Sequence, residues 1–193
     1  MSSFSKLTIT PTTIADVFVI EPKVFGDERG LFMESFNEQD LAVALGQNIT
    51  FVQDNHSFSK QWTLRGMHFQ AEQPQGKLVR VVQGLVFDVA VDVRKNSPTY
   101  GQWVGVEIGA QNHKQLWIPP GLAHGFLVLS RTAEFLYKTT DYYHPKSEVS
   151  LAWNDLAVGI HWPLPDGIMP NMNVKDQMGL SLKQLADFND GLI

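Results

Sequence analysis

The chain has 193 residues, of which 44% are hydrophobic and 18% are charged, as is typical of a globular protein with a sizeable core. Its length favours one domain spanning residues 1–193. The formal net charge of −5 argues against a general nucleic-acid binder. The absence of cysteine excludes disulfides, thiolate nucleophiles and cysteine-based zinc sites.

The sequence carries no sign of a membrane or export segment. The initial stretch MSSFSKLTIT lacks the apolar core of a signal peptide. The longest apolar tract, residues 116–129, is interrupted by Pro119 and Pro120 and contains His124. We therefore expect a cytoplasmic protein with no membrane partner.

The first third of the chain predicts short strands and one helix. Residues 7–20 alternate loosely around a turn at 11–13, and VFGDERGLFMESF (24–36) reads as a turn followed by a strand. Asn37 is a good helix cap, and the apolar run DLAVAL ends at Gly46, so we expect a helix over residues 38–45. Residues 50–56 predict another strand.

Strands dominate from residue 77 onward. The run 77–93 breaks at Gly84, and its second half alternates valines on one face with Asp88, Ala90 and Asp92 on the other. Further strands are expected at 103–108, 115–118, 125–129 and 134–139, and a capped helix only after Ser181. Many short strands separated by turns indicate an all-β sandwich or barrel.

The stretch from Leu64 to Val93 gathers residues suited to proton transfer and anion binding. His68 follows Arg65, and Lys77 and Arg80 come shortly after it. A lone histidine is more often a hydrogen-bonded structural residue, but so many cations in one segment are costly to bury without a function. Nearby positive charge disfavours protonation of an imidazole, so His68 is a candidate general base near neutral pH.

A second cluster, WIPPGLAHGF (117–126), delivers His124 onto a strand after a rigid turn. The spacing from Pro119 to His124 resembles the second motif of cupin barrels, in which the histidine binds a metal. The first cupin motif needs two histidines separated by one residue, and here Gln70 stands in place of the second. The sequence therefore favours a cupin-like barrel without a metal site.

Several other residues have both a structural and a functional interpretation. Tyr137 is either a sheet aromatic or, on the inner wall of a barrel, a proton donor, because a phenol stays protonated at neutral pH. Phe32 and Tyr142 are suited to sandwiching a flat ring. Arg29 belongs either to a solvated turn or to a diphosphate site, since its guanidinium matches anionic oxygens. Nothing in the local sequence singles out Asp176.

Taken together, segments spread along the chain resemble the dTDP-4-dehydrorhamnose 3,5-epimerase family. They are FGDERGLFMESF, FVQDNHS, LRGMHFQ, QGKLVRVVQG, FDVAVDVR, SPTYGQW, QLWIPPGLAHGF, YKTTDYY, and WND followed by Trp162. They keep the family's order over roughly residues 15–180, so the resemblance does not rest on one motif. It implies an all-β, cupin-like double-stranded β-helix, or jelly-roll, barrel with a few short helices.

The resemblance also implies roles for individual residues. His68 would be the general base, oriented by Asp176, with Tyr137 as the opposing acid and Lys77 near the C4 oxygen of the sugar. The implied substrate-binding residues are Arg29, Phe32, Glu34, Gln53, Asn55, Arg65, His124, Tyr142 and Glu148. Among these, the arginines would meet phosphate or sugar oxygens, and Phe32 and Tyr142 would lie against the thymine.

The implied reaction inverts C3 and C5 of dTDP-4-dehydro-6-deoxy-D-glucose through enolates, which gives dTDP-4-dehydro-L-rhamnose. No cofactor is expected, because the C4 ketone is the electron sink. The resemblance further implies a homodimer in which an N-terminal strand joins the sheet of the partner, a sensible arrangement for exposed β-edges.

Other functions remain as alternatives. A metal-dependent cupin would use His68, His124 and a carboxylate, against which Gln70 counts. A non-catalytic sugar- or nucleotide-binding β-sandwich would explain the aromatics and arginines, but it would not need His68, Lys77, Tyr137 and Asp176 together. A related cupin that inverts C3 alone, or isomerises the keto sugar, would use the same base and acid.

Overall fold

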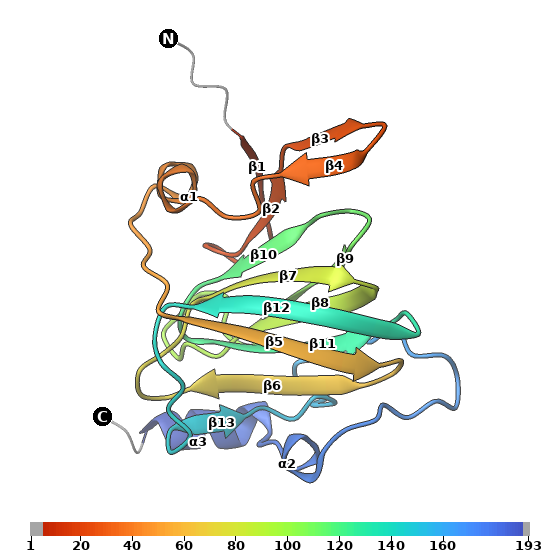
Figure 1. Ribbon diagram of the computed structural model, residues 1–193. Coiled ribbons are helices and arrows are strands. Elements are labelled where there is room, and N and C mark those ends of the chain that lie inside the picture. Colours follow the sequence, from red (N-terminus) through yellow and green to blue (C-terminus); the bar gives the residue numbers. More distant parts are fainter. Residues whose placement is uncertain (1–5, 191–193) are drawn as a thin grey trace.

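The computed structural model describes residues 6–190, which fold into two antiparallel sheets that face each other (Figure 1). The six-stranded sheet has the order β1-β2-β10-β7-β12-β5, and the five-stranded sheet has the order β13-β6-β11-β8-β9. Their strands are β1 (Leu7–Pro11), β2 (Phe18–Pro22), β5 (Gln53–Lys60), β6 (Leu64–Gln70), β7 (Lys77–Gln83), β8 (Leu85–Asp92), β9 (Trp103–Gly109), β10 (Gln115–Ile118), β11 (Leu122–Val128), β12 (Thr132–Thr139) and β13 (Glu148–Ser150). This is the all-β jelly roll that the sequence predicts.

Alternation along the strands divides the apolar residues between three clusters. Val79, Val86 and Phe135 belong to the cluster between the sheets. The valines of β8 that the sequence assigns to one face, including Val89, pack instead on the outer side of the five-stranded sheet. That outer side is covered by the C-terminal helix, whose Leu185 is fully buried there. Each such buried aliphatic side chain contributes about 1.5–3 kcal/mol.

Asp88 and Ala90 alternate with these valines, as predicted, and face the space between the sheets. The third cluster, around Trp117, lies on the outer side of the six-stranded sheet beneath the first helix.

Two predicted helices are confirmed and one helix was missed. In α1 (Glu38–Leu45) the Asn37 side chain accepts hydrogen bonds from Gln39 N and Asp40 N, and Gly46 ends the helix with a φ of 68°. The helix α3 (Leu182–Asp190) follows Ser181. The prediction of no helix between these two is wrong, because α2 (Val174–Gln177) forms one turn capped by Asn173.

Two strand boundaries also differ from the prediction. The strand expected at 50–56 is β5, which starts at Gln53 and continues to Lys60 because it pairs along its whole length with β12. The strand expected at 125–129 begins at Leu122, where its pairing with Asp92 of β8 begins. Both differences in strand boundary arise from pairing with a neighbouring strand, and the local sequence does not reveal which strand that is.

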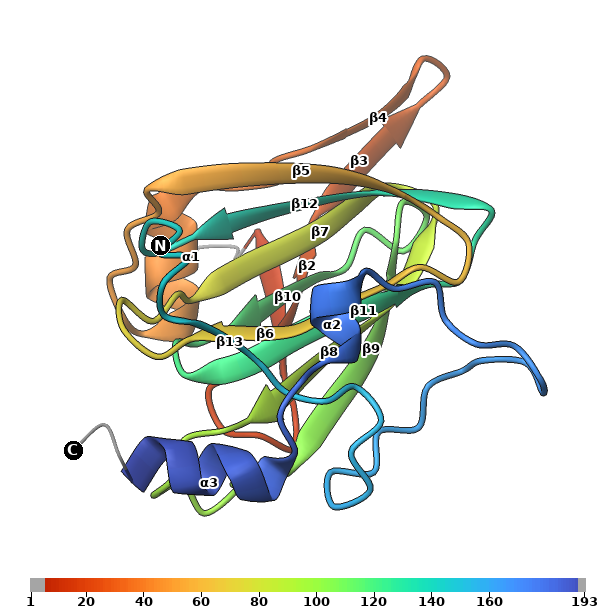
Figure 2. The same ribbon diagram turned by 90° about the horizontal axis from the view of Figure 1, so that it is seen from below.

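A hairpin of β3 (Val24–Asp27) and β4 (Gly30–Met33) extends away from the barrel (Figures 1 and 2). It exposes four apolar side chains, those of Val24, Phe25, Leu31 and Phe32. Figure 2 also shows α3 and α2 on the five-stranded side of the molecule. Among residues 6–190 no helix has the length and apolar character needed to cross a membrane.

Candidate active site

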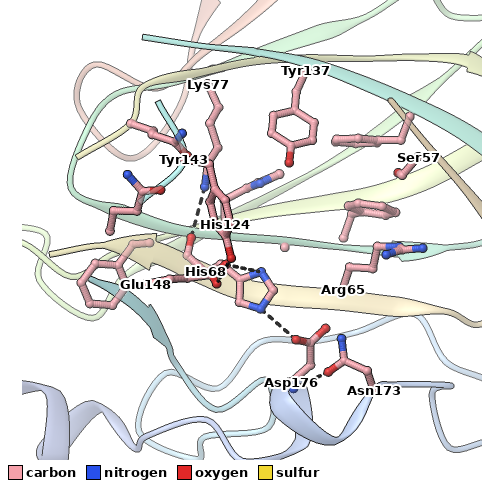
Figure 3. Close-up of a pocket in the computed structure, with 16 residues that line it drawn as sticks. Ser57, Arg65, His68, Lys77, His124, Tyr137, Tyr143, Glu148, Asn173 and Asp176 are labelled. Atoms are coloured by element: carbon pink, nitrogen blue, oxygen red, sulfur yellow. Dashed lines mark hydrogen bonds and ion pairs between the residues drawn. The ribbon is translucent and has the colours of Figure 1, made fainter. Parts of the chain in front are cut away.

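A cavity between the two sheets gathers most of the residues predicted to act on a substrate (Figure 3). Its polar lining includes Arg65 and His68 from β6, Lys77 from β7, His124 from β11, Tyr137 from β12, Glu148 from β13 and Asp176 from α2. All four residues predicted to be catalytic therefore line one cavity, although they are spread over more than a hundred positions of the sequence.

His68 and Asp176 form a hydrogen-bonded pair on the five-stranded side of the cavity. His68 Nε2 lies 2.8 Å from Asp176 Oδ1, and Asp176 Oδ2 accepts from Gly66 N at 3.3 Å. Burial raises the pKa of Asp176, but the hydrogen bond and charge of His68, together with the bonds from Gly66 and Asn173, outweigh burial, and the net pKa lies below the ordinary value. Asp176 is thus an anion that fixes the imidazole and leaves Nδ1 free to face the cavity.

Gly66 lets the chain come close enough for this arrangement. Its φ is +111°, and a Cβ built there would lie 2.6 Å from Gly125 Cα on the neighbouring strand. Any other residue would therefore clash with β11. The clash would displace the part of β6 that carries His68 and that binds Asp176 through Gly66 N.

Lys77 is almost fully buried, and its ammonium donates to the carbonyl oxygen of His68 at 3.2 Å. Burial lowers the pKa of Lys77 to about 8, although the charges of Asp88 and Glu148 oppose this effect. Lys77 is therefore a cation at neutral pH that is ready to stabilise a developing negative charge.

A second histidine–carboxylate pair lies beside the first. His124 is directly opposite His68 in the β6–β11 pairing, and its Nε2 lies 3.0 Å from Asp88 Oδ2. Both groups are buried, so burial raises the pKa of Asp88 and lowers that of His124. The sequence placed Asp88 on the face of its strand opposite the valines but gave it no role, because its partner is 36 residues away.

Tyr137 projects from the opposite sheet, and Figure 3 shows its hydroxyl pointing into the cavity towards the side that holds His68. Burial, reinforced by the charge of Glu148, raises the pKa of Tyr137 above the ordinary value. The phenol is therefore protonated at neutral pH. A ligand in the cavity would lie between an imidazole on one sheet and a phenol on the other.

Glu148 connects the His68 side of the cavity to two residues that were not among the predicted site residues, Tyr143 and Lys175. Glu148 Oε1 lies 3.8 Å from His68 Nδ1, and Oε2 accepts from the hydroxyl of Tyr143 at 2.9 Å. Lys175 of α2 forms an ion pair with the same carboxylate. Burial raises the pKa of Glu148, but hydrogen bonds from Lys175 and Tyr143 bring it below the ordinary value.

The remaining predicted binding residues lie outside this cavity in the single chain. Arg29 is exposed on the hairpin and pairs with Asp27, Phe32 is 69% exposed, and Glu34 pairs with Lys6 at 2.9 Å. Tyr142 is also exposed and is not part of the cavity lining, whereas its neighbour Tyr143 is.

Gln53 and Asn55 lie along β5, at the edge of the six-stranded sheet. Gln53 donates to Asn55 Oδ1 at 2.9 Å and accepts from the backbone N of Tyr143 at 3.1 Å. These two residues are therefore placed next to the loop that carries Tyr143.

The residues described contain no group of three or more histidine, aspartate or glutamate side chains placed to hold a metal ion. His68 and His124 each direct Nε2 to a carboxylate, and Gln70 directs its amide to backbone groups. The fold and the cavity thus define a cupin-type barrel that carries acid–base residues at the centre.

Comparison with known proteins identifies the family. The family model for dTDP-4-dehydrorhamnose 3,5-epimerase matches residues 11–184. The dTDP-4-dehydrorhamnose 3,5-epimerase of Salmonella typhimurium is 57% identical over 179 residues, which cover 92% of this chain and 97% of that protein.

Two solved structures are also similar. The Legionella pneumophila dTDP-6-deoxy-D-glucose-3,5-epimerase in complex with dTDP-4-keto-L-rhamnose has a TM-score of 0.88 and 50% identity, covering 92% of this chain and 93% of that one. A 3'-monoepimerase from Streptomyces bikiniensis in complex with dTDP-quinovose has a TM-score of 0.86 and 32% identity, covering 95% and 91%. The chain belongs to the dTDP-4-dehydrorhamnose 3,5-epimerase family, and it is an enzyme of the epimerase class.

Proposed function

We propose that the enzyme inverts C3 and C5 of dTDP-4-dehydro-6-deoxy-D-glucose and so produces dTDP-4-dehydro-L-rhamnose. The observation that carries the proposal is the placement of His68 and Tyr137 on opposite sheets of one cavity. Inversion requires that a proton leave one face of a carbon and another arrive on the opposite face. A base and an acid on facing walls meet that requirement.

The base is His68. The C4 ketone acidifies the hydrogens at C3 and C5, and the proton passes to Nδ1 of His68, since Nε2 is engaged with Asp176. The bonding electrons of the C–H bond form a C=C bond, and the carbonyl π electrons move to the C4 oxygen. Asp176, held as an anion, stabilises the imidazolium that results.

Lys77 stabilises the negative oxygen of the enolate. Its buried ammonium acts in a low-dielectric site, where such a charge is worth more than in water. Tyr137 then donates the phenolic proton to the carbon from the other face, and the ketone re-forms. Solvent returns a proton to Tyr137 and takes one from His68, so the cycle needs no oxidant or reductant.

The same proposal assigns the remaining groups to ligand binding. Arg65 and His124 contact the sugar–diphosphate from inside the cavity, and Glu148 lies between His68 and Tyr143. Gln53, Asn55 and Tyr142 belong to the nucleotide end. The side chains of Arg29, Phe32 and Glu34 lie on or next to a hairpin outside the cavity. In this proposal they contact the ligand that is bound in the cavity of a second chain.

A homodimer with exchanged N-terminal strands is therefore part of the proposal. Its support is the apolar surface of Phe25, Leu31 and Phe32 on the extended hairpin, because exposed patches of this kind favour association. Light scattering should give twice the chain mass of 21.7 kDa. Replacing Phe32 by Ala should then weaken dTDP binding, and a monomer with unchanged binding would contradict this part.

The experiment that tests the reaction is NMR of the dTDP-keto sugar incubated with the enzyme in D₂O. The proposal predicts deuterium at both C3 and C5 and conversion to the L-rhamno configuration. Deuterium and inversion at C3 alone would assign the enzyme to a monoepimerase reaction, the reaction for which the similar 3'-monoepimerase of Streptomyces bikiniensis is named. No label at either carbon would contradict the proposal.

A further inference from the structure

Gln70 is the last residue of β6, two positions after His68, and its side chain makes three hydrogen bonds to backbone groups. Its Nε2 donates to Gln73 O at 2.7 Å and to Tyr142 O at 3.2 Å, while its Oε1 accepts from His144 N at 2.9 Å. The residue is 5% exposed. Gln70 lines the cavity, but both donors of its amide are used within the protein, so the amide has no donor left for a ligand.

These bonds join two loops at one end of the cavity. The first is residues 71–76, which follow β6, and the second is residues 140–147, which lead from β12 to β13; we refer to the second as the rim loop. The two loops are also joined by side-chain bonds from Gln75 Nε2 to Asp141 O, from Gly76 N to Thr140 Oγ1 and from Ser147 Oγ to Glu72 O, and by the backbone bonds Ala71 N to Ser147 O and Thr140 N to Gly76 O. Of these groups, only the Gln70 side chain binds on both sides of Tyr143.

The rim loop carries the groups next to His68. Tyr143 lies between the two rim-loop residues that Gln70 binds, Tyr142 and His144, and its hydroxyl donates to Glu148 at 2.9 Å. Glu148 is the direct cross-strand partner of Gln70 in the β6–β13 pairing. The Gln70 amide therefore holds the backbone on each side of Tyr143. Tyr143 in turn contacts Glu148, whose carboxylate lies 3.8 Å from His68 Nδ1.

We propose that Gln70 is a positioning residue that holds the rim loop in its ligand-binding shape and acts on nucleotide binding through Tyr143. This inference rests on the proposed function, since it takes the nucleotide to be the dTDP moiety. Without the Gln70 bonds the rim loop keeps its other attachments, but the backbone on each side of Tyr143 is held less firmly, and affinity falls by the fraction of molecules in the competent shape. The chemical step, which belongs to His68, Lys77 and Tyr137, would be little changed.

The first test is Gln70→Ala, with dTDP binding measured by calorimetry and turnover measured on the keto sugar. We expect the Kd for dTDP and the KM to rise about tenfold and kcat to stay within about threefold of the parent. Gln83→Ala is the matched control, because this exposed glutamine donates to Thr132 Oγ1 at the far end of β7 and should change nothing. Unchanged Kd in Gln70→Ala, or a loss confined to kcat, would overturn the inference.

A double-mutant cycle separates this role from a general loss of stability. If Gln70 acts through Tyr143, Tyr143→Phe and Gln70→Ala together should weaken dTDP binding by less than the product of their separate effects. Fully multiplicative effects would contradict the assignment. If the parent enzyme itself binds no dTDP, the proposed function fails, and that outcome is distinct from a parent that binds while Gln70→Ala binds equally well.

If Gln70→Ala fails to fold, Gln70→Glu tests the same inference, because it keeps the volume of the side chain. An ionised carboxylate faces the oxygens of Gln73 and Tyr142 without a proton to donate, so dTDP binding should again weaken. Protonation at lower pH restores one donor and should bring the Kd of the variant closer to that of the parent. A pH-independent ratio between the two, or affinity equal to the parent, would overturn the inference.

Discussion

His68 and Asp176 lie 108 positions apart in the sequence and share a hydrogen bond of 2.8 Å inside the barrel. Asp176 lies in the single turn of α2, which Asn173 caps by accepting a hydrogen bond from Asp176 N at its Oδ1, 2.7 Å away. The carboxylate is 2% exposed; burial raises its pKa, but the interactions with His68, Gly66 and Asn173 together outweigh burial and bring the pKa below its ordinary value. The pair thus has a fixed orientation, which the proposed mechanism uses to present His68 as the base.

The first prediction concerns this pair. His68→Asn should lower kcat by at least about 10³-fold, because it removes the group that takes the proton. Asp176→Asn should cost less, about 10²-fold, because the imidazole stays in place but loses the anion that stabilises its charged form. Steady-state kinetics on the keto sugar measure both, with dTDP binding as the control for an intact site. Parent-like rates in Asp176→Asn would show that the two residues do not act together.

Lys77 gives the second prediction, a pH dependence. The pKa of Lys77 is lowered to about 8 by burial, so the ammonium is present below this pH and is lost as the pH rises through it. Turnover should therefore decline above about pH 8. In Lys77→Arg the charge persists at higher pH, and the residual activity should show no decline in that range. An alkaline limb that is identical in the two enzymes would assign it to another group.

Asp88 provides an independent check on the same charge. Its carboxylate opposes the effect of burial on Lys77, so Asp88→Asn should lower the pKa of Lys77 further. The alkaline decline in turnover should then begin at a lower pH than in the parent. A decline that moves to higher pH, or stays where it is, would contradict the coupling of these two buried groups.

The third prediction concerns stability away from the cavity. Asp92 is fully buried and accepts hydrogen bonds from the backbone and side chain of Arg94 and from the hydroxyls of Ser97 and Thr99. Burial raises the pKa of Asp92, but these bonds outweigh it and hold the pKa at about 2. Asp92→Asn should lower the free energy of unfolding by about 2–4 kcal/mol at neutral pH.

The pH dependence of that effect has a definite sign. A carboxyl group with a depressed folded-state pKa contributes stability above the ordinary pKa of about 4, and this is lost as the pH falls through about 2. The difference between the parent and Asp92→Asn in urea unfolding should shrink accordingly on acidification. A difference that is constant with pH would mean that the charge of Asp92 is not what stabilises the turn.

The fourth prediction is that chelators leave the rate unchanged. Within residues 6–190 no three histidine or carboxylate side chains are placed to hold one ion, and Gln70 stands where a metal-binding cupin has a histidine. Prolonged treatment with EDTA should therefore not lower turnover. Loss of activity that one particular metal restores would contradict this prediction and would make His124 a candidate ligand.

The sequence predicted the strands well where alternation or turn residues mark them. Gly84, for example, separates β7 from β8 as expected, and it has a φ of +83°. The sequence was a poor guide to features that depend on contacts between residues distant in the chain. The one-turn helix α2 is too short for a periodic signal, and Lys175 gains its role only through Glu148.

The same limit applies to the candidate site. The absence of a histidine at position 70 was apparent from the sequence, but the clamping bonds of Gln70 involve a loop more than 70 positions away. Likewise, local sequence does not reveal that Tyr143 rather than Tyr142 lines the cavity, since the loop that holds both is shaped by Gln53 and Gln70.

The central claim is that His68 and Tyr137 act on opposite faces of the sugar, and one comparison tests it most directly. Exchange of the hydrogens at C3 and C5 with D₂O is measured alongside product formation in Tyr137→Phe and in His68→Asn. In Tyr137→Phe the enolate should still form at His68 and be reprotonated from the same face, so deuterium should enter unconverted substrate while product formation falls steeply. In His68→Asn exchange and product formation should be lost together. If Tyr137→Phe also loses both in parallel, or retains full epimerisation, Tyr137 is not the acid and the account is wrong.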